Sequence, residues 1–258
     1  MRGPKVSIIT VVFNGEKFLD QAIQSVAAQS YEPIEYIVVD GGSTDTSLSI
    51  IECRQDVIDR WVSEPDEGIY DAMNKGIRLA TGEYLFFLNA DDFFSGPEVV
   101  ERMVGRLADG EAGYCGMVRM VDAEGRGLYT MRTVPDDPFA YLMHQGFLYK
   151  RELHMAFGYY NVTFRVNGDY DFYLRLLKGG QRLIYGDDVI CHMRVGGVSG
   201  TMGYLSAVET LYIQVRSKLP VSRALRIFHL KLIKIMGKSL LVSLGIGRAV
   251  YLLKRRRV

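Results

Sequence analysis

The 258-residue chain has few cysteines and lacks two common nucleotide-binding motifs. Its three cysteines, Cys53, Cys115 and Cys191, lie far apart, which argues against a disulfide framework or a CxxC metal site and favours a reducing compartment. No Gly-x-Gly-x-x-Gly follows the first apolar run and no Walker A sequence occurs, so the dinucleotide-binding and P-loop classes lose their main support. The N-terminal segment MRGPKVSIITVVFNGE shows no small-residue cleavage site, and we interpret its apolar run as a first strand.

Acidic residues are absent from the last part of the chain. Residues 210–258 hold 12 of the 31 Lys and Arg residues and none of the 30 Asp and Glu residues, although the formal net charge of the whole chain is only +1. The body that precedes this tail therefore carries an excess of acid. Such asymmetry predicts an anionic partner for the tail, either a nucleic acid or a membrane surface.

The tail also lacks the run of about 20 apolar residues that a membrane-spanning helix needs. Residues 222–238 place five basic side chains among leucines and isoleucines at helical spacing: Arg223, Arg226, Lys231, Lys234 and Lys238. We therefore expect this tail to lie in the interface of an anionic membrane. A helix packed on the acidic body is the alternative. Nucleic acid is disfavoured, because the tail has neither interleaved aromatic residues nor a recognisable binding module.

The first 110 residues alternate strand-like and helix-like runs. The expected strands cover residues 6–12, 36–39 and 84–88, and the expected helices cover residues 16–29, 46–54 and 70–80. This βαβα order predicts an α/β fold with a mostly parallel sheet and helices on both faces. Ligands of such sheets bind beyond the carboxyl ends of the strands, so the polar residues that end these strands define a candidate site.

The rest of the chain changes its pattern twice. Residues 112–149 predict shorter strands, with turns at 124–127 and 135–138. A helix over 169–177 and strands over 183–185 and 189–193 follow, and the pattern beyond Gly203 is wholly helical. These changes divide the chain into segments 1–110, 111–200 and 201–258.

The segment DGGSTDTS, residues 40–47, follows the second expected strand. Asp40 ends an Ile-Val-Val run, where a carboxylate suits hydrogen bonds from a base or a ribose, and two glycines let the backbone approach a ligand closely. A tight turn that ends in a helix cap at Thr44 or Asp45 explains the same residues. Further on, Asp71, Asn74 and Lys75 share one helical turn, which a solvated helix face with one ion pair explains equally well.

Two adjacent carboxylates, Asp91 and Asp92, follow the apolar run LFFL and Asn89. Buried carboxylates lose free energy unless a donor or a cation compensates them. Mg²⁺ or Mn²⁺ takes one or two carboxylates and completes its shell with substrate phosphate oxygens. Such an ion neutralises the charge that develops on a leaving diphosphate. The alternative is a surface turn that caps a helix starting near Pro97.

Six ordered segments form a specific set, although each alone is weak: VSIITVVFNGEKFLDQAIQSV, EYIVVDGGSTDTS, SEPDEGIYDAMNKGIRLATGEYLFFLNADD, HQGFLYKR, NGDYDFYLRLL and GGVSG. Together they resemble family 2 glycosyltransferases of the GT-A fold, particularly those that build bacterial O-antigen or exopolysaccharide. The resemblance covers about residues 5–200. It implies that segment 1–110 is the nucleotide-sugar-binding half of the domain, that 111–200 is the acceptor-binding and catalytic half, and that 201–258 forms membrane-associated helices.

The resemblance also implies roles for the donor side. Asp40 is expected to hold the uracil of a UDP-sugar, with further nucleotide contacts from Asn14, Gly42, Ser43, Asp66 and Lys75. Asn89-Ala90-Asp91 matches the D-x-D element of the family, which implies that Asp91 binds Mn²⁺ or Mg²⁺ and that Asn89 accepts a ribose hydroxyl. The first Asp of that element is replaced here by Asn, so Asp92 is expected to share the metal.

On the acceptor side, the resemblance implies that Asp169 is the general base, with Gly168 in place of the usual Glu and Asp171 as the reserve base. Asp169 as a simple helix cap is the alternative. His144 and Gln145 fall where the acceptor should bind. His192 is expected to be a further metal or diphosphate contact, or else a structural histidine.

The sequence therefore predicts an inverting, metal-dependent glycosyltransferase. It moves a sugar from a nucleotide diphosphate donor, expected to be UDP, to a glycan or lipid-linked acceptor in surface polysaccharide biosynthesis. We expect it in the cytoplasm, peripherally associated with the inner face of the cytoplasmic membrane. The alternatives are a non-catalytic sugar-nucleotide-binding scaffold subunit and a metal-dependent phosphohydrolase.

Overall fold

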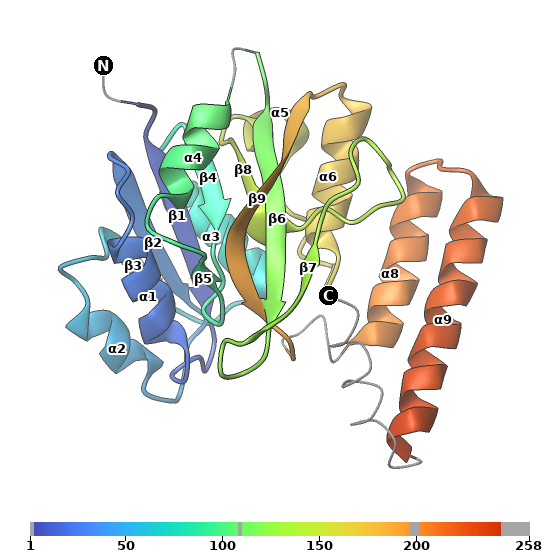
Figure 1. The fold of residues 1–258 in the computed structure, drawn as a ribbon, viewed down its shortest axis with the longest axis horizontal. Coiled ribbons are helices and arrows are strands. Elements are labelled where there is room, and N and C mark those ends of the chain that lie inside the picture. Colours follow the sequence, from blue (N-terminus) through green and yellow to red (C-terminus); the bar gives the residue numbers. More distant parts are fainter. Residues whose placement is uncertain (1–2, 108–109, 197–201, 244–258) are drawn as a thin grey trace.

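The protein folds around one mixed sheet, seen in a computed structural model that describes residues 3–107, 110–196 and 202–243, and side chains up to residue 237 (Figure 1). The strand order is β3-β2-β1-β4-β8-β6-β9-β5, and β7 pairs with β6. The parallel part begins with β1 (Val6–Val12), β2 (Ile34–Asp40), β3 (Arg60–Ser63) and β4 (Tyr84–Phe87). It confirms the predicted α/β class.

The strands beyond β4 complete the sheet. They are β8 (Phe147–Lys150), β6 (Gly113–Val121), β9 (Leu183–Arg194), β5 (Phe93–Phe94) and β7 (Gly127–Met131). β8 runs antiparallel to both β4 and β6, which makes β6 and β9 parallel to β4 again. The carboxyl ends of β1, β2, β4 and β9 therefore meet at one edge.

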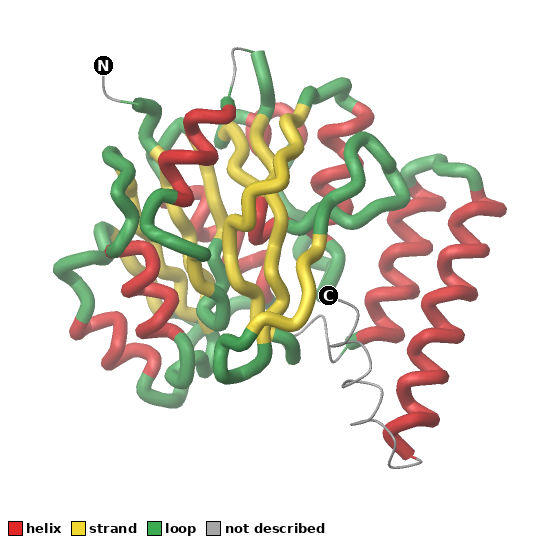
Figure 2. The backbone as a smooth tube through the Cα atoms, viewed as in Figure 1, coloured by secondary structure: helices red, strands yellow, loops and turns green. Residues whose placement is uncertain are grey.

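Helices cover both faces of the sheet (Figure 2). One face packs against α1 (Leu19–Ala27), α2 (Ser47–Cys53) and α4 (Val99–Arg106), and the other against α3 (Ile69–Leu79), α5 (Leu153–Phe157) and α6 (Gly168–Lys178). Successive side chains of a strand point to opposite faces, so Ile8 joins the first core and Ile9 the second. Strands buried on both faces need continuous apolar sequence, and β1 has it.

The structure differs from the predicted elements in a few places. The two strands expected at 183–185 and 189–193 form one strand, β9, because it pairs with β6 across two register shifts that absorb the polar residues between them. The short strands β3 and β5, the helix α5 and a 3₁₀ turn, η1 (His144–Gly146), were not predicted. Segments of two to five residues carry too little periodicity to be recognised.

Two helices, α8 (Gly203–Arg216) and α9 (Val221–Ser243), form a hairpin beside the sheet, on the side away from β3 (Figure 1). This confirms the predicted helical tail as far as residue 243, and residues 244–258 lie outside the described part of the chain. The buried Glu209 fastens α8 to the domain, because its carboxylate accepts hydrogen bonds from the backbone N–H groups of Arg165, Val166 and Asn167 at 2.7, 3.0 and 2.9 Å. Among the described residues, no helix is long and apolar enough to cross a membrane.

Two basic side chains of the tail contact the domain. Lys231 donates hydrogen bonds to the hydroxyls of Tyr141 and Thr210, and burial lowers its pKa to about 8. Arg223 forms an ion pair with Asp137 at 3.0 Å. The contacts of these two side chains agree with the alternative prediction, in which the tail helix packs on the acidic body. Residues 254–257, the last basic cluster, lie outside the described part of the chain.

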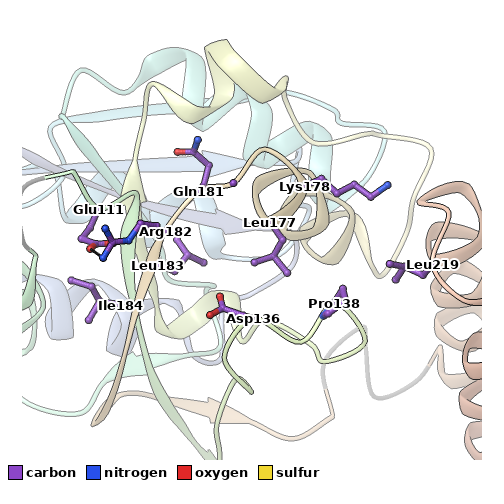
Figure 3. A pocket seen from close by; sticks show the side chains of 11 residues that line it. Glu111, Asp136, Pro138, Leu177, Lys178, Gln181, Arg182, Leu183, Ile184 and Leu219 are labelled. Atoms are coloured by element: carbon purple, nitrogen blue, oxygen red, sulfur yellow. Dashed lines mark ion pairs between the residues drawn. The ribbon is translucent and has the colours of Figure 1, made fainter.

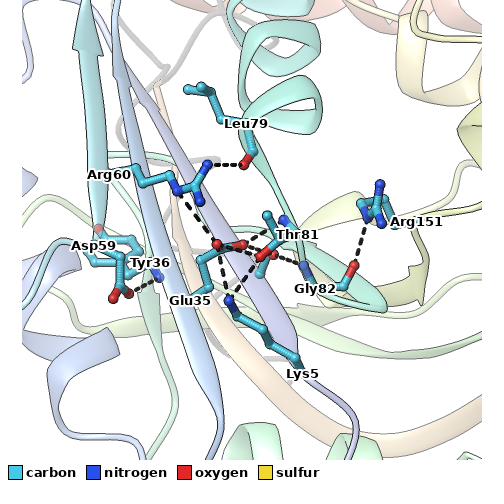
Figure 4. A network of polar contacts seen from close by, with 10 residues as sticks. Lys5, Glu35, Tyr36, Asp59, Arg60, Leu79, Thr81, Gly82 and Arg151 are labelled. Atoms are coloured by element: carbon cyan, nitrogen blue, oxygen red, sulfur yellow. Dashed lines mark hydrogen bonds and ion pairs between the residues drawn. The ribbon is translucent and has the colours of Figure 1, made fainter.

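A buried carboxylate ties together the amino ends of the strands (Figure 4). Glu35 accepts hydrogen bonds from the Ser7 hydroxyl at 2.6 Å, from the backbone N–H and hydroxyl of Thr81 at 2.8 and 2.7 Å, and from Lys5 at 3.2 Å. Burial raises the pKa of Glu35, but these hydrogen bonds together outweigh it and lower the pKa to about 2. The network fixes the end of the sheet opposite the candidate site.

Candidate active site

Two loops interlock where β1 and β2 end. Asn14 lies in the left-handed region, with φ 51°, and its side-chain oxygen accepts a hydrogen bond from the Thr44 N–H at 2.8 Å. Its own N–H donates to the Ser43 hydroxyl at 2.8 Å. The predicted contact residues Asn14 and Ser43 are therefore neighbours, and their loops form one surface at the carboxyl edge of the sheet.

Asp40 organises this loop from inside. It is fully buried, and its carboxylate accepts hydrogen bonds from the N–H groups of Gly42 and Ser43 at 3.1 and 3.0 Å and from the hydroxyls of Ser43 and Ser63 at 2.5 and 2.6 Å. Gly42 has φ 82°, which explains the glycine at that position. The oxygens of Asp40 are thus directed to its own loop, which the sequence could not reveal.

An exposed aromatic ring and a second carboxylate meet over Gly41. A Cβ atom built on Gly41 would lie 2.3 Å from Asp66 Oδ2 and 3.5 Å from the Phe13 ring. The Phe13 side chain is 65% exposed although it directly follows a buried strand. Lys75 holds the neighbouring loop, because its ammonium donates to the Pro65 carbonyl at 2.7 Å and pairs with Glu64 at 3.0 Å. Phe13 was not predicted as a site residue, although a large aromatic residue stands directly before Asn14 in the sequence.

In the acid pair after β4, Asp91 is half-buried, whereas Asp92 is buried and incompletely hydrogen-bonded. Asp92 is 1% exposed; its Oδ1 accepts a hydrogen bond from the Arg194 N–H at 3.2 Å, whereas Oδ2 has no partner among the described residues. The Asn89 side-chain oxygen also lacks a partner within the described chain. Burial, followed by the charge of Asp91, holds the pKa of Asp92 well above its usual value. Burial likewise raises the pKa of Asp91.

Arg194, at the end of β9, holds the acid pair in place. Its guanidinium donates to the Asp91 carbonyl and to the Gln21 side chain, each at 2.5 Å, and lies 4.0 Å from the centre of the Phe18 ring. Arg194 is 5% exposed, and the charge of this buried cation opposes the rise in the pKa of both Asp91 and Asp92. Arg194 was not predicted as a site residue, because more than 100 residues separate it from Asp91 in the sequence.

Whether a metal ion fits at the acid pair depends on which ligating side chains lie around it. In the described parts of the chain, no group of three or more His, Cys, Asp or Glu residues could hold a metal. His192 packs edge-on against Phe93, with ring centres 4.8 Å apart, and burial lowers its pKa. Asp91, Asp92 and His192 thus do not form a three-ligand centre. The two carboxylates alone, with an unpartnered oxygen, fit a Mg²⁺ or Mn²⁺ ion that completes its shell with substrate oxygens and water.

A histidine of η1 and an aspartate of α6 form a pair. Asp169, in the first turn of α6, places Oδ2 3.2 Å from His144 Nδ1, and its Oδ1 accepts a hydrogen bond from the Tyr70 hydroxyl at 3.0 Å. Next to His144 in η1, the buried Gln145 side chain lies close enough to Asp92 to oppose the rise in the pKa of that carboxyl. The structure therefore brings His144, Gln145 and Asp169 into one group with the acid pair, and adds Tyr70, which the sequence analysis missed.

Asp171 does not join this group. It is 6% exposed and accepts a hydrogen bond from Arg175 at 3.1 Å, on a different side of α6 from Asp169. The glycine before Asp169 also has a local cause. A Cβ atom on Gly168 would lie 2.9 Å from the Tyr70 ring, so a Glu there would displace the tyrosine that contacts Asp169.

A cavity of about 760 Å³ lies apart from this group (Figure 3). It opens at the amino ends of β6 and β9, between Leu183 and the end of α6, and an ion pair between Arg182 and Glu111 closes one side at 3.1 Å. The acid pair lies at the carboxyl ends of the same strands. The cavity is therefore not part of the candidate active site.

This sheet and its carboxyl-edge loops have the GT-A fold, found in glycosyltransferases that use nucleotide sugars. Residues 7–168 match the family model described as glycosyl transferase family 2, and the chain belongs to that family. Its similarity to an uncharacterized glycosyltransferase of Mycobacterium tuberculosis is 38% identity over 184 residues, 67% of this chain and 68% of that protein. The protein is therefore a glycosyltransferase, which favours transfer over the scaffold and phosphohydrolase alternatives.

Two solved structures share the fold. The mannosyltransferase PcManGT from Pyrobaculum calidifontis, in complex with GDP-Man and Mn²⁺, has a TM-score of 0.67 and 21% identity over 99% of this chain and 83% of that one. TarS from S. aureus, in complex with UDP-GlcNAc, has a TM-score of 0.66 and 18% identity over 88% of this chain and 71% of that one. At these identities the likeness concerns the fold alone.

Proposed function

We propose that this enzyme transfers a sugar from a UDP-sugar, with inversion at the sugar carbon, to a glycan or lipid-linked acceptor of a surface polysaccharide. The observation that carries the proposal is the incompletely hydrogen-bonded acid pair Asp91-Asp92, which lies between the interlocked loops of β1 and β2 and the His144–Asp169 pair. Unpartnered buried carboxylate oxygen is costly unless a ligand completes it.

The donor side supplies the nucleotide contacts. Phe13 and Asp66 flank Gly41, where an exposed ring stacks on a nucleobase and a carboxylate accepts its N–H. Asn14 supports this surface through its contacts with the neighbouring loop. The unpartnered side-chain oxygen of Asn89 accepts a hydrogen bond from a ribose hydroxyl. Further members of the surface act through the backbone or hold its loops: Asp40, Gly42, Ser43 and Lys75.

Asp91 and Asp92 would hold a Mn²⁺ or Mg²⁺ ion. When bound, such an ion neutralises the charge that develops on the leaving diphosphate. Arg194 keeps the backbone of Asp91 in place through its carbonyl hydrogen bond. His192, whose Nδ1 has no partner within the described residues, faces the same region and is proposed as a diphosphate contact.

The acceptor hydroxyl must lose a proton as it attacks the sugar carbon. The groups proposed to lie beside the acceptor hydroxyl are His144, Gln145 and Asp169. They lie on the other side of the acid pair from the donor loops. Attack from the side opposite the diphosphate inverts the configuration of the sugar carbon. Asp171 serves the site indirectly, through its ion pair with Arg175 within α6.

The exposed side of the helical hairpin favours a lipid-linked acceptor and peripheral binding to the inner face of the cytoplasmic membrane. Large apolar side chains are exposed on both helices, most of them three or four residues apart: Tyr204, Leu205, Val208, Tyr212, Val215, Leu225, Leu230, Ile233 and Met236. Arg226 and Lys234 are exposed among them. Apolar residues flanked by cations fit an anionic lipid surface.

Calorimetric titration of UDP tests the donor site. We expect binding to the wild type in Mn²⁺, weaker binding in EDTA, and loss of the metal-dependent part in Asp91→Ala. Asp187→Ala is the matched control, because it removes a carboxylate of β9 that is 76% exposed. This variant should bind UDP as the wild type does. If the wild type binds no UDP either in Mn²⁺ or in EDTA, the proposed donor is rejected.

Sedimentation with vesicles tests the hairpin surface. The double substitution Ile233→Glu and Met236→Glu should abolish co-sedimentation with vesicles of anionic phospholipid, because charge enters the apolar side. Met155→Glu places a charge at an apolar side chain that is 78% exposed on α5, and should leave sedimentation unchanged. Equal sedimentation of all three proteins would contradict the membrane proposal.

A further inference from the structure

The segment directly before Asp169 has no regular secondary structure. Residues 158–167 form neither a helix nor a strand, and they connect the end of α5 to Gly168, the first residue of α6. The backbone of such a segment is fixed by the partners that its N–H and C=O groups find elsewhere in the fold. Because Asp169 lies in the first turn of α6, its position depends on the contacts of this segment.

Three successive N–H groups of this segment converge on one carboxylate of α8. The N–H groups of residues 165–167 donate to Glu209, whose Oε1 accepts the first and whose Oε2 accepts the other two. Successive N–H groups that point to one anion curve the backbone around it. Hydrogen bonds to a charged acceptor are also stronger than those to a neutral one, and Glu209 is only 7% exposed. This carboxylate therefore determines the path of the segment.

Two further contacts connect the segment to α8 and to Asp169. The buried Asn167 side chain donates to the Ser206 carbonyl of α8 at 2.8 Å. The Tyr70 hydroxyl lies 2.7 Å from the Val166 carbonyl and 3.0 Å from Asp169 Oδ1. Since one hydroxyl contacts both the segment and the carboxylate, a shift of the segment alters the surroundings of Asp169.

The two carboxylates lie close to a common neighbour but have different exposure. Burial raises the pKa of Tyr141, and the charges of Asp169 and Glu209 are further causes of the rise, so both carboxylates lie within electrostatic reach of its hydroxyl. The Asp169 side chain keeps 14% of its surface exposed, beside His144. Glu209 instead directs both oxygens to backbone N–H groups. This difference favours a role for Glu209 that acts through Asp169.

We propose that Glu209 of α8 is a positioning residue for sugar transfer, because it holds residues 165–167 and thereby the Asp169 carboxylate. Asp169 is the general base that the sequence predicts, so the inference rests on the proposed function. The acceptor hydroxyl gives its proton to Asp169 as its oxygen bonds to the sugar carbon, and the nucleoside diphosphate leaves with the electron pair of the broken bond. Displacement of a reacting group by about 1 Å can cost about 100-fold in rate. The helical hairpin thus contributes to the chemistry of the site.

The substitution Glu209→Gln tests this role. The amide keeps the shape of the side chain but replaces one acceptor oxygen by an NH₂ group, which meets at least one of the three N–H donors. With a UDP-hexose as donor and an alkyl glycoside as acceptor, kcat should fall by about 10- to 100-fold, because the segment shifts. The affinity for UDP should stay within about threefold of the wild-type value, since a group that acts on the chemical step alone leaves donor binding intact.

Two comparisons distinguish positioning from support of the fold. Glu35→Gln is the matched control, because Glu35 is also a buried carboxylate that accepts a backbone N–H, but at the opposite end of the sheet. It should lose stability without the loss in kcat. Glu209→Gln combined with Asp169→Asn should transfer no more slowly than Asp169→Asn alone, because residues that act as one unit are not additive. Independent losses that add in the double variant would overturn the inference.

A second variant, Asn167→Ala, removes the hydrogen bond to the Ser206 carbonyl and decides the question if Glu209→Gln does not fold. It should also lower kcat while the affinity for UDP is retained. A folded Glu209→Gln enzyme with the kcat of the wild type would overturn the inference, and so would an equal loss of kcat in Glu35→Gln. A wild type that binds UDP but transfers no sugar would instead reject the proposed function, and the inference with it.

Discussion

Two buried carboxylates lie at opposite ends of the sheet and have opposite surroundings. Glu35, at the start of β2, is 3% exposed, and Ser7, Thr81 and Lys5 donate hydrogen bonds to both of its oxygens (Figure 4). Asp92, after β4, is 1% exposed and leaves one oxygen without a partner in the described chain. The pKa of Glu35 is lowered to about 2, whereas burial holds that of Asp92 well above its usual value.

The difference separates a carboxylate that stabilises the fold from one that is kept for a ligand. Glu35 joins β1, β2 and the turn before β4, and its donors offset the cost of burial. Asp92 bears that cost beside a second carboxylate, and binding of a cation would recover the lost free energy. Substituting each carboxylate by its amide should therefore change stability at one end and catalysis at the other.

The largest effect is expected from Asp92→Asn. It should lower the rate of sugar transfer about 1000-fold, equivalent to about 4 kcal/mol. The reason is that the cation that neutralises the leaving diphosphate loses a charged ligand oxygen. The free energy of unfolding should change by less than about 1 kcal/mol, since the amide oxygen still accepts the Arg194 N–H. Transfer assays and urea unfolding measure the two quantities. A large loss of stability would show that Asp92 supports the fold.

Glu35→Gln should do the reverse. The free energy of unfolding should fall by about 2 to 3 kcal/mol, because hydrogen bonds to a charged, buried group are replaced by neutral ones and one donor meets an amide N–H. The transfer rate should stay within about twofold of the wild type, because the side chain lies at the amino ends of the strands. Loss of transfer in a stably folded variant would break the comparison between the two ends.

The pH dependence of unfolding gives a third test. The folded-state pKa of Glu35 is below its ordinary value of 4.5, so its contribution to stability is complete above pH 4.5 and is lost as the pH falls towards 2. Urea unfolding of the wild type and Glu35→Gln should differ by a constant amount above about pH 5, and the difference should shrink in acid. A difference that is independent of pH would exclude ionised Glu35 as its source.

Much of the fold could be predicted because its central strands are buried on both faces. β1 was predicted at its exact bounds, since an uninterrupted apolar run ends at a polar turn. β9 was not, because Gly186 and the two aspartates after it are typical of a turn. In the structure Gly186 instead makes room for the Tyr114 hydroxyl, which would lie 2.1 Å from a Cβ atom there.

The site could be predicted only as far as residues adjacent in sequence. Asp91 and Asp92 reveal themselves, because two acids after an apolar strand need a partner. Arg194 and Tyr70 can be recognised as site residues only in the folded chain, where Arg194 contacts Asp91 and Tyr70 contacts Asp169. Side-chain direction is equally invisible in a sequence. The sequence predicts Asp40 as a nucleotide contact, and only the structure shows that its carboxylate also accepts hydrogen bonds from Gly42 and Ser63.

The smallest effect is expected from Lys5→Met, which removes one of two cations paired with Glu35 and leaves the more distant Arg60, whose Nε lies 3.8 Å from Glu35 Oε1. Lys5 is 42% exposed and lies 3.2 Å from Glu35, so solvent weakens the ion pair, and the hydrogen bonds from Ser7 and Thr81 remain. We expect the free energy of unfolding to fall by no more than about 1 kcal/mol. Ser7→Ala, measured in the same way, should cost more, because it removes the donor nearest to a buried oxygen. A larger loss in Lys5→Met than in Ser7→Ala would mean that charge neutralisation, and not the set of neutral donors, distinguishes Glu35 from Asp92.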